Sequence, residues 1–254
     1  RHNPITEKFL MENKIYTAPV ETTVVNEGLR EYLMKVFNYM AGGLCITALA
    51  SYLIISNPSI MRLFYNITPQ SAGLSALGWI AFLAPLVIVF AFGWVINRGT
   101  ASQVKGVFWL YSALMGVSLC PILLLYTGES VTRVFLITAS TFGAMSLVGF
   151  LIKRDLSFVG RFAMMALIGI IIASIVNIFV ASSALYWGVT YLGVLLFAGL
   201  TAYDTQKIKM MLMQYGSEVN NDTMKMALMG SLTLYLDFVN LFLFILRIVG
   251  GNRE

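Results

Sequence analysis

From Phe162 to Tyr203 the chain contains no Asp, Glu, Lys or Arg. One helix needs about 20 apolar residues to cross a bilayer, so this stretch is long enough for two helices. The small polar cluster Ala181-Ser182-Ser183 lies near its middle and offers a place for the chain to turn. The stretch therefore predicts two consecutive helices that cross a membrane.

The rest of the sequence has the same character. Only 11% of the residues are charged and 58% are hydrophobic, whereas soluble proteins have about 25% charged residues. The pattern predicts an all-α integral membrane protein with seven transmembrane helices and no separate soluble domain. We expect the spans at about Glu31–Ser56, Ala76–Asn97, Gly106–Tyr126, Val131–Ile152, Phe162–Val180, Leu185–Lys209 and Lys225–Val249.

Residues 1–30 are polar and charged and predict a cytoplasmic tail in front of a single transmembrane domain, residues 31–254. We expect a polar loop at Asn66–Gln70 between the first two spans. Gly42 and Gly43 should let a neighbouring helix approach the first span closely. Ala139, Gly143 and Ser146 form a small-residue face on the fourth span, for which we expect the same use.

Lys and Arg residues indicate the orientation, because they concentrate on the cytoplasmic side of membrane proteins. With the N-terminus inside, 13 of the 17 basic residues are cytoplasmic and the C-terminus is outside. The net charge of +5 thus reflects membrane topology, and we expect no nucleic-acid partner. The inside set is Arg1, Lys8, Lys14, Arg30, Lys35, Arg98, Lys105, Lys153, Arg154, Arg161, Lys207, Lys209 and Lys225, and the outside set is Arg62, Arg133, Arg247 and Arg253.

Residues for catalysis or tight metal binding are scarce. His2 is the single histidine, and the two cysteines, Cys45 and Cys120, lie inside apolar runs where we expect them to be buried. Serine, histidine and cysteine are not arranged for nucleophilic chemistry. We therefore expect a protein that is not an enzyme and that carries no cofactor.

Two carboxylates stand out, because each lies in an apolar run of the last third of the chain. They are Asp204 in the sixth span and Asp237 in the seventh. A charge in a membrane helix costs about 2.5–3.5 kcal/mol unless it is paired, hydrated or neutralised. At the rise of an α-helix the two residues lie roughly 12 and 21 Å from the cytoplasmic turn that joins the spans. We expect them to meet in the inner half of the membrane.

Two carboxylates in contact at low dielectric do not ionise independently and share a proton. Such a pair is a candidate pH sensor on an ion pathway, and when deprotonated it offers oxygen ligands for transient binding of Ca²⁺. Arg98 ends the second span on the same side of the membrane and is the natural counter-charge. Asp204, Asp237 and Arg98 are therefore the candidate site.

Simpler interpretations of these residues remain open at this stage. Asp204 can be a residue near a helix end that pairs with Lys207, one turn further on. Arg98 can be an ordinary interfacial anchor. Asp237 can make a purely structural hydrogen bond to a neighbour on its own helix: Ser231, Tyr235 or Asn240.

Several motifs together resemble the transmembrane Bax inhibitor motif family, and the resemblance covers nearly the whole chain from the first span on. The short loops are similar to those of bacterial members. The motifs are Tyr203-Asp204-Thr205-Gln206 with Ile208, the run Leu234 to Phe242, Met115-Gly116 with Ser118-Leu119 and Pro121, Phe142-Gly143, Lys153 with Asp155-Leu156-Ser157, and Asn177-Ile178-Phe179.

The resemblance implies a fold of two three-helix layers around a central C-terminal helix. It also implies a pH-sensitive calcium leak, in which the family's paired aspartates match Asp204 and Asp237 and its latch arginine falls on Arg98. The chain departs from the pattern at Val87, where at least one relative has a glutamate. If that acid attracts cations, this protein conducts less, or differently.

Two functions from different classes follow. The first is a pH-sensitive calcium leak channel of the bacterial inner membrane, with Ca²⁺ as the permeant ion. The alternative is a regulatory membrane protein that binds other membrane proteins, such as a membrane protease or its substrates. Proton-coupled transport of a small solute needs a cavity that the sequence does not reveal. An intramembrane aspartyl hydrolase is disfavoured, because the motifs around both aspartates match the Bax inhibitor pattern.

Overall fold

The computed structural model describes residues 4–68, 71–215 and 221–251, with the backbone alone at 4–27, 67–68, 71–72, 212 and 214–215. Eight helices and one two-stranded hairpin follow one another in these segments. They are α1 (Pro4–Ser56), α2 (Pro58–Phe64), β1 (Tyr65–Thr68), β2 (Ser71–Leu74), α3 (Ala76–Arg98), α4 (Ala101–Leu125), α5 (Gly128–Leu151), α6 (Ser157–Val180), α7 (Ser183–Tyr215) and α8 (Asn221–Val249).

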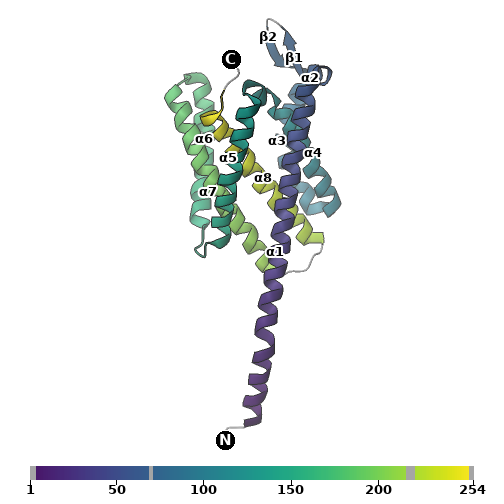
Figure 1. The fold of residues 1–254 in the computed structure, drawn as a ribbon, viewed down its shortest axis with the longest axis vertical. Helices are drawn as coiled ribbons and strands as arrows, with labels where there is room; N and C mark the ends of the chain where they lie inside the picture. The colour runs from purple at the N-terminus through teal and green to yellow at the C-terminus, as the bar shows by residue number, and fades with distance from the viewer. Residues whose placement is uncertain (1–3, 69–70, 216–220, 252–254) are drawn as a thin grey trace.

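Seven helices of the described chain are long and apolar enough to cross a membrane, which confirms the predicted number and class. They run alternately up and down, so that α1 enters the bundle at the end where α7 meets α8, and α8 finishes at the opposite end (Figure 1). We call these the lower and upper ends, as in Figure 1. The apolar part of α1 begins at Gly28, and its helical backbone already starts at Pro4, within the segment predicted as a polar tail.

Helix starts differ from the predicted spans because polar caps extend the helices beyond their apolar cores. Thr100 and Gln103 form a reciprocal capping box, so α4 begins at Ala101. Thr127 accepts a hydrogen bond from the amide of Ser130 and starts α5 at Gly128. Each cap satisfies an amide of the first turn that has no partner within the helix.

The segment between α1 and α3 is more ordered than the polar loop that we expected. Asn57 caps α2 by accepting from the amides of Ser59 and Ile60, with Pro58 at the first helical position. Strands β1 and β2 then pair antiparallel, with Tyr65 opposite Leu74. The Tyr65 hydroxyl donates to the carbonyl oxygen of Val117 at 2.5 Å and ties the hairpin to α4. Pro69 and Gln70, at the tip of the expected loop, lie outside the described residues.

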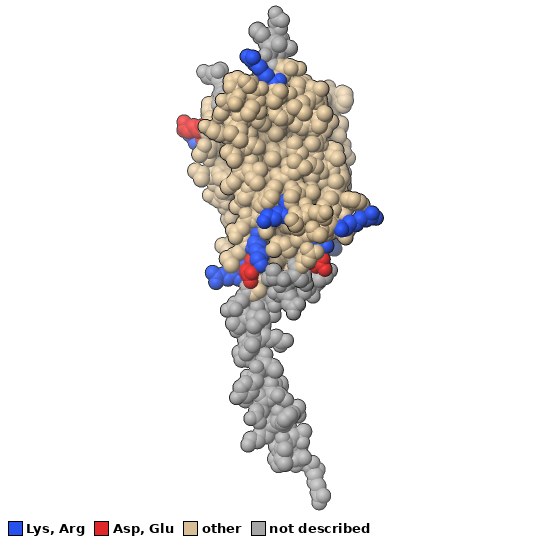
Figure 2. All heavy atoms as spheres, turned by 90° about the vertical axis from the view of Figure 1, so that its right-hand side faces the viewer, with Lys and Arg blue, Asp and Glu red and all other residues tan. Residues whose placement is uncertain are grey.

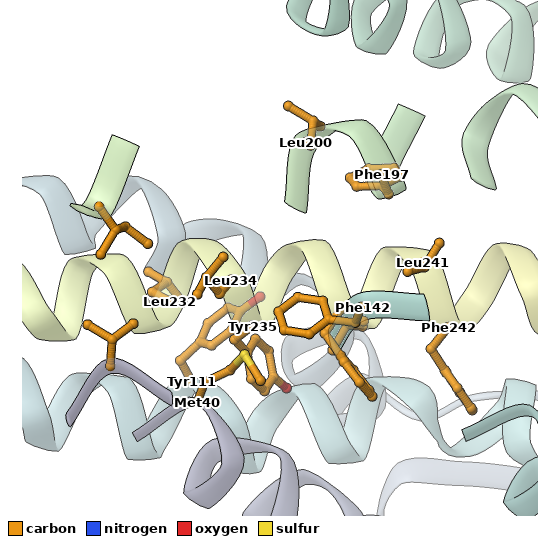
Figure 3. Close-up of a cluster of buried hydrophobic side chains, with 14 of the residues drawn as sticks. Met40, Tyr111, Phe142, Phe197, Leu200, Leu232, Leu234, Tyr235, Leu241 and Phe242 are labelled. Carbon is orange, nitrogen blue, oxygen red and sulfur yellow. The ribbon is translucent and has the colours of Figure 1, made fainter. Parts of the chain in front are cut away.

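Helix α8 is the core of the bundle and packs against α1, α4, α5 and α7. Over half of the residues in its apolar segment are buried, against about a tenth in α6. Side chains from several helices converge on it, with Met40 and Tyr111 beside Tyr235 (Figure 3) and Phe142 and Phe197 packed on Phe238 and Phe244 further along α8. This confirms the central C-terminal helix, while the division of the other spans into two layers of three stays a prediction.

The outer helices present apolar side chains to the surroundings. Helix α3 packs on α4, and α6 packs on α7. The face shown in Figure 2 has an uncharged middle belt, with Lys and Arg gathered mainly toward the lower end of the bundle. Cys120 is buried as predicted, but Cys45 is exposed. The prediction for Cys45 is wrong because an apolar side chain in a membrane span is as well placed against lipid as inside the protein.

Glycines allow close helix contacts at several places, and two of these places bear on the predictions. Gly43 confirms the prediction, since a Cβ atom there would lie 2.8 Å from the Phe108 ring on α4. The predicted helix contact at Gly143 on α5 is wrong, because a Cβ atom there meets nothing within 4 Å. Gly149, further along the same helix, lies against α7. A Cβ atom on Gly149 would lie 2.1 Å from the carbonyl oxygen of Ala202. Backbone therefore meets backbone where α5 crosses α7.

We predict that Gly149→Ala pushes α5 away from α7 and lowers the free energy of unfolding by about 1–3 kcal/mol, the usual cost of overpacking. The matched control is Gly143→Ala on the same helix, where a Cβ atom meets nothing within 4 Å. Thermal unfolding of the purified proteins in detergent measures both. An unchanged Tm for Gly149→Ala would show that the α5–α7 contact adapts without cost.

Candidate functional site

The two aspartates predicted as a pair lie together between α7 and α8. Asp204 is 9% exposed and Asp237 is 4% exposed. The two carboxyl groups lie within interaction distance of each other. Their helices are antiparallel neighbours, and α8 is the most buried of the seven long apolar helices, with Met229 and Val249 among its exposed residues. The expected meeting of Asp204 and Asp237 is therefore observed.

No other group supplies hydrogen bonds to the pair in the part of the chain that the structure describes. The Oδ2 atom of Asp237 is buried and accepts no bond from an N–H or hydroxyl group there. The three suggested neighbours on α8 are engaged elsewhere. Ser231 donates to the carbonyl oxygens of Val36 and Ala227, Tyr235 bonds Thr47, and Asn240 donates to Leu236.

A hydrogen bond between two carboxyl groups needs one proton, because a carboxylate only accepts hydrogen bonds. Two unit negative charges in contact repel by about 4 kcal/mol at an effective dielectric constant of roughly 20. Protonation therefore changes both the charge of such a pair and the force between the helices that carry it.

Basic residues near the lower end of α7 do not form ion pairs with the site. The charge of Lys207 acts on Asp204, but its side chain is exposed and the two make no ion pair among the described residues. Lys209 donates to the carbonyl oxygen of Phe150 at 2.7 Å and lies over the Phe150 ring. The simple pairing of Asp204 with Lys207 is thus not what holds Asp204 in place.

Arg98 is not brought to the aspartates in this conformation. It is the last residue of α3, its side chain is exposed, and its guanidinium group lies 5.3 Å from the centre of the Trp94 ring on the same helix. That is the position of an interfacial anchor. The assignment of Arg98 as a latch stays a prediction and requires a second conformation in which α3 turns toward the pair.

The pair by itself is a sparse metal site. Among the described residues no group of three or more His, Cys, Asp or Glu side chains is placed to hold a metal ion. Ca²⁺ takes six to eight oxygen ligands, so two carboxylates would leave most of its shell to water and backbone. Such a site suits an ion that passes and is released.

Gln206, two residues after Asp204, has a role that the sequence did not reveal. Its buried amide donates to the carbonyl oxygens of Ile152 and Arg154, at 3.4 and 2.8 Å, and accepts from the amide of Leu156 at 2.9 Å. It therefore fastens the loop between α5 and α6 to α7, directly below the aspartate pair. In the sequence, only the position of Gln206 in the Tyr203–Gln206 motif indicated that this residue has a role.

Asp155 in the same loop is a carboxylate of a different kind. Its Oδ1 atom accepts from the hydroxyl and the amide of Ser157, at 2.6 and 2.8 Å. These hydrogen bonds hold the pKa of Asp155 below its ordinary value. Asp155 thus stays ionised at neutral pH, so a response to pH in that range needs another group.

A bundle of seven long apolar helices with a carboxyl pair buried beside its central helix defines an integral membrane protein with an acidic pair inside the bundle. Residues 29–254 match the model of the family described as "Inhibitor of apoptosis-promoting Bax1". The match covers more than half of the chain, and the chain belongs to this Bax inhibitor family. The resemblance seen in the motifs is confirmed.

Bacterial relatives match over nearly their whole length. The chain is 42% identical over 226 residues to "Inner membrane protein YbhL" of Escherichia coli (strain K12), covering 89% of this chain and 94% of the relative. It is 42% identical over 243 residues to "Uncharacterized protein RP147" of Rickettsia prowazekii, covering 94% and 99%. An uncharacterized protein of Caulobacter vibrioides is 40% identical over 234 residues, covering 91% and 92%.

We predict that Gln206→Ala loosens the α5–α6 loop. The substitution removes the hydrogen bonds of Gln206 to backbone groups of Ile152, Arg154 and Leu156, each worth a net of about 0.5–1.5 kcal/mol. Trypsin should then cut at the exposed Lys153 and Arg154 about tenfold faster, since 1.4 kcal/mol of easier opening is a factor of ten. The control is Gln103→Ala, which removes a cap of α4 at the same end of the bundle. Equal rates in wild type and Gln206→Ala would refute the loop-fastening role.

Proposed function

We propose that this protein is a pH-sensitive calcium leak channel whose conduction is controlled by the shared proton of Asp204 and Asp237. The contact between these two buried carboxyl groups is the observation that carries the proposal. It lies where the central helix meets α7, so a change in its charge acts on the packing of the whole bundle. Membership of the Bax inhibitor family supports the same conclusion.

The physical basis is a change in sign of the force between α7 and α8. With one proton the carboxyl groups attract each other through a hydrogen bond. Without it they repel and gain from hydration or from a cation between them. The deprotonated pair thereby supplies the oxygen ligands that Ca²⁺ prefers, in a segment that otherwise excludes water. Loss of the shared proton thus both loosens the helix contact and makes a cation site.

Charge placement supports an orientation with the lower end in the cytoplasm. Described Lys and Arg residues are concentrated there, as expected for the cytoplasmic side. The lower set is Arg30, Lys35, Arg98, Lys105, Lys153, Arg154, Arg161, Lys207, Lys209 and Lys225, and the upper set is Arg62, Arg133 and Arg247. The name of the Escherichia coli relative supports the bacterial inner membrane as the location. The N-terminus would then be cytoplasmic and the C-terminus outside.

We predict that Asp204→Asn and Asp237→Asn each remove the pH dependence of Ca²⁺ flux. Either amide keeps a hydrogen bond across the pair but cannot exchange a proton, so the ratio of fluxes at roughly pH 6 and pH 8 should fall to about one. Proteoliposomes loaded with a Ca²⁺-sensitive dye measure the flux. Asp222→Asn is the matched control, because Asp222 lies on the same helix as Asp237 and its side chain is 80% exposed.

Two results would decide against the proposal. Wild-type pH dependence in both variants would show that the pair does not sense pH. No flux above empty liposomes at any pH would favour the alternative, a regulatory protein that binds other membrane proteins. Arg98→Ala in the same assay tests the latch: a shifted pH midpoint supports it, and an unchanged profile leaves Arg98 as an interfacial anchor.

A further inference from the structure

The upper end of the bundle, far from the aspartate pair, contains a cavity of about 460 Å³. It lies between α4, α6, α7 and α8, and its walls are mostly apolar, with Ile122, Ile178 and Leu243 among them. Arg247, in the last turn of α8, also lines it. A cation beside an apolar cavity within a membrane protein requires an explanation of its own.

Arg247 is held by aromatic rings and not by an acid. Its guanidinium group lies 5.3 Å from the centre of the Phe244 ring and 5.9 Å from that of Tyr186. Arg247 makes no ion pair or hydrogen bond with the described residues. Among those residues, Glu129 is the acidic residue at the upper end. Glu129 is itself paired with Arg133 at 2.6 Å. Stacking uses the face of a guanidinium group, so the N–H edge of Arg247 stays available for a planar or tetrahedral anion.

Further donors line the same cavity. The Oδ1 atom of Asn177 accepts from the amide of Ser182 at 2.9 Å, which leaves the NH₂ group of Asn177 as its remaining polar group. Tyr126 and Tyr186, which each carry a hydroxyl group, also line the cavity. One cation and several donors, without a carboxylate on the lining, make a site that selects a net negative charge.

The level of the cavity in the membrane indicates the class of anion. Helices α4 and α6 end beside it at Leu125 and Val180, and α7 begins at Ser183. The rings of Tyr186 and Trp187 meet edge to face near the start of α7. Tyr and Trp residues are enriched at the membrane–water interface. Arg247 therefore lies at the depth of lipid headgroups, with apolar walls toward the bilayer centre.

An adjoining groove completes the fit to an amphipathic ligand. It has a volume of about 560 Å³ and follows the seam between α6 and α7, where small residues such as Ala166, Gly169 and Gly188 keep it open. Val189 lines both the groove and the Arg247 cavity. A headgroup at Arg247 would thus have an apolar channel beside it for an acyl chain.

We propose that the Arg247 cavity binds the headgroup of an anionic phospholipid of the outer leaflet, with Arg247 on its phosphate and an acyl chain along the α6–α7 groove. A zwitterionic lipid fits less well, because its ammonium group would find no carboxylate on the lining. The site is independent of the aspartate pair and of whether the protein conducts ions.

Native mass spectrometry of the purified protein tests the proposal, with phosphatidylglycerol and phosphatidylcholine offered in equal amounts. Wild type should retain one phosphatidylglycerol in preference to phosphatidylcholine. Arg247→Gln should lower the fraction carrying phosphatidylglycerol about tenfold, the effect of losing one charge-assisted contact. Arg62→Gln removes a positive charge from the same end without freeing an acid and should change nothing. Arg247→Lys keeps the charge without the bidentate geometry and should show an intermediate loss.

Three outcomes would overturn the proposal. One is equal retention of phosphatidylglycerol by wild type and Arg247→Gln. Another is equal retention of the two lipids by wild type. The third is displacement of phosphatidylglycerol by free sn-glycerol 3-phosphate at a matched concentration, which would assign the site to a soluble phosphate. If Arg247→Gln does not fold, Arg247→Lys and Asn177→Ala carry the same comparison, because each removes part of the site.

Discussion

The close approach of Asp204 and Asp237 is the contact on which the centre of this bundle depends. The pair has no other hydrogen-bond donor among the described residues, and no ion pair relieves its charge. Helix α8 must nevertheless be buried by its neighbours, because it is the core against which α1, α4, α5 and α7 pack. Under the proposed function, a shared proton lets the most buried helix carry an acid without a fixed counter-charge. A structural ion pair would give stability alone, whereas a shared proton would also make the packing depend on pH.

Polar contacts divide the helices into two groups that meet at the pair. Gln206 ties α7 to the α5–α6 loop, and Lys209 ties it to the last turn of α5. On the other side Ser231 bonds the carbonyl oxygen of Val36, and Tyr235 bonds Thr47, so α8 is tied to α1. Between the groups the contacts within the bundle are largely apolar, such as the packing of Phe142 on Phe238. Repulsion between the carboxylates would therefore act on a boundary that few hydrogen bonds cross.

Sequence reasoning located the pair because a short turn fixes the depth of residues on two consecutive helices. It did not reveal the Gln206 clamp, whose partners lie 50 to 54 residues away. The predicted burial of Cys45 was wrong, and the sequence could not show whether the Arg98 side chain points toward the aspartates. Both depend on which side of a membrane helix faces lipid, and hydropathy does not reveal this. Polarity is the better guide to burial here. The uniformly apolar α6 is largely exposed, while α8, with Ser231, Tyr235 and Asp237, is the core.

The upper end of the bundle has a polar link between the two groups of helices. After α8 the chain returns to α5, where the amide of Gly251 donates to Ser130 at 2.7 Å and its carbonyl oxygen accepts from Thr127. This link joins the two groups at the upper end, whereas Asp237 lies near the middle of α8, with 16 residues of the helix before it and 12 after it. Under the proposed function, helices fastened at the upper end and repelled at mid-length would separate most toward the lower, basic end, while the upper end keeps its packing.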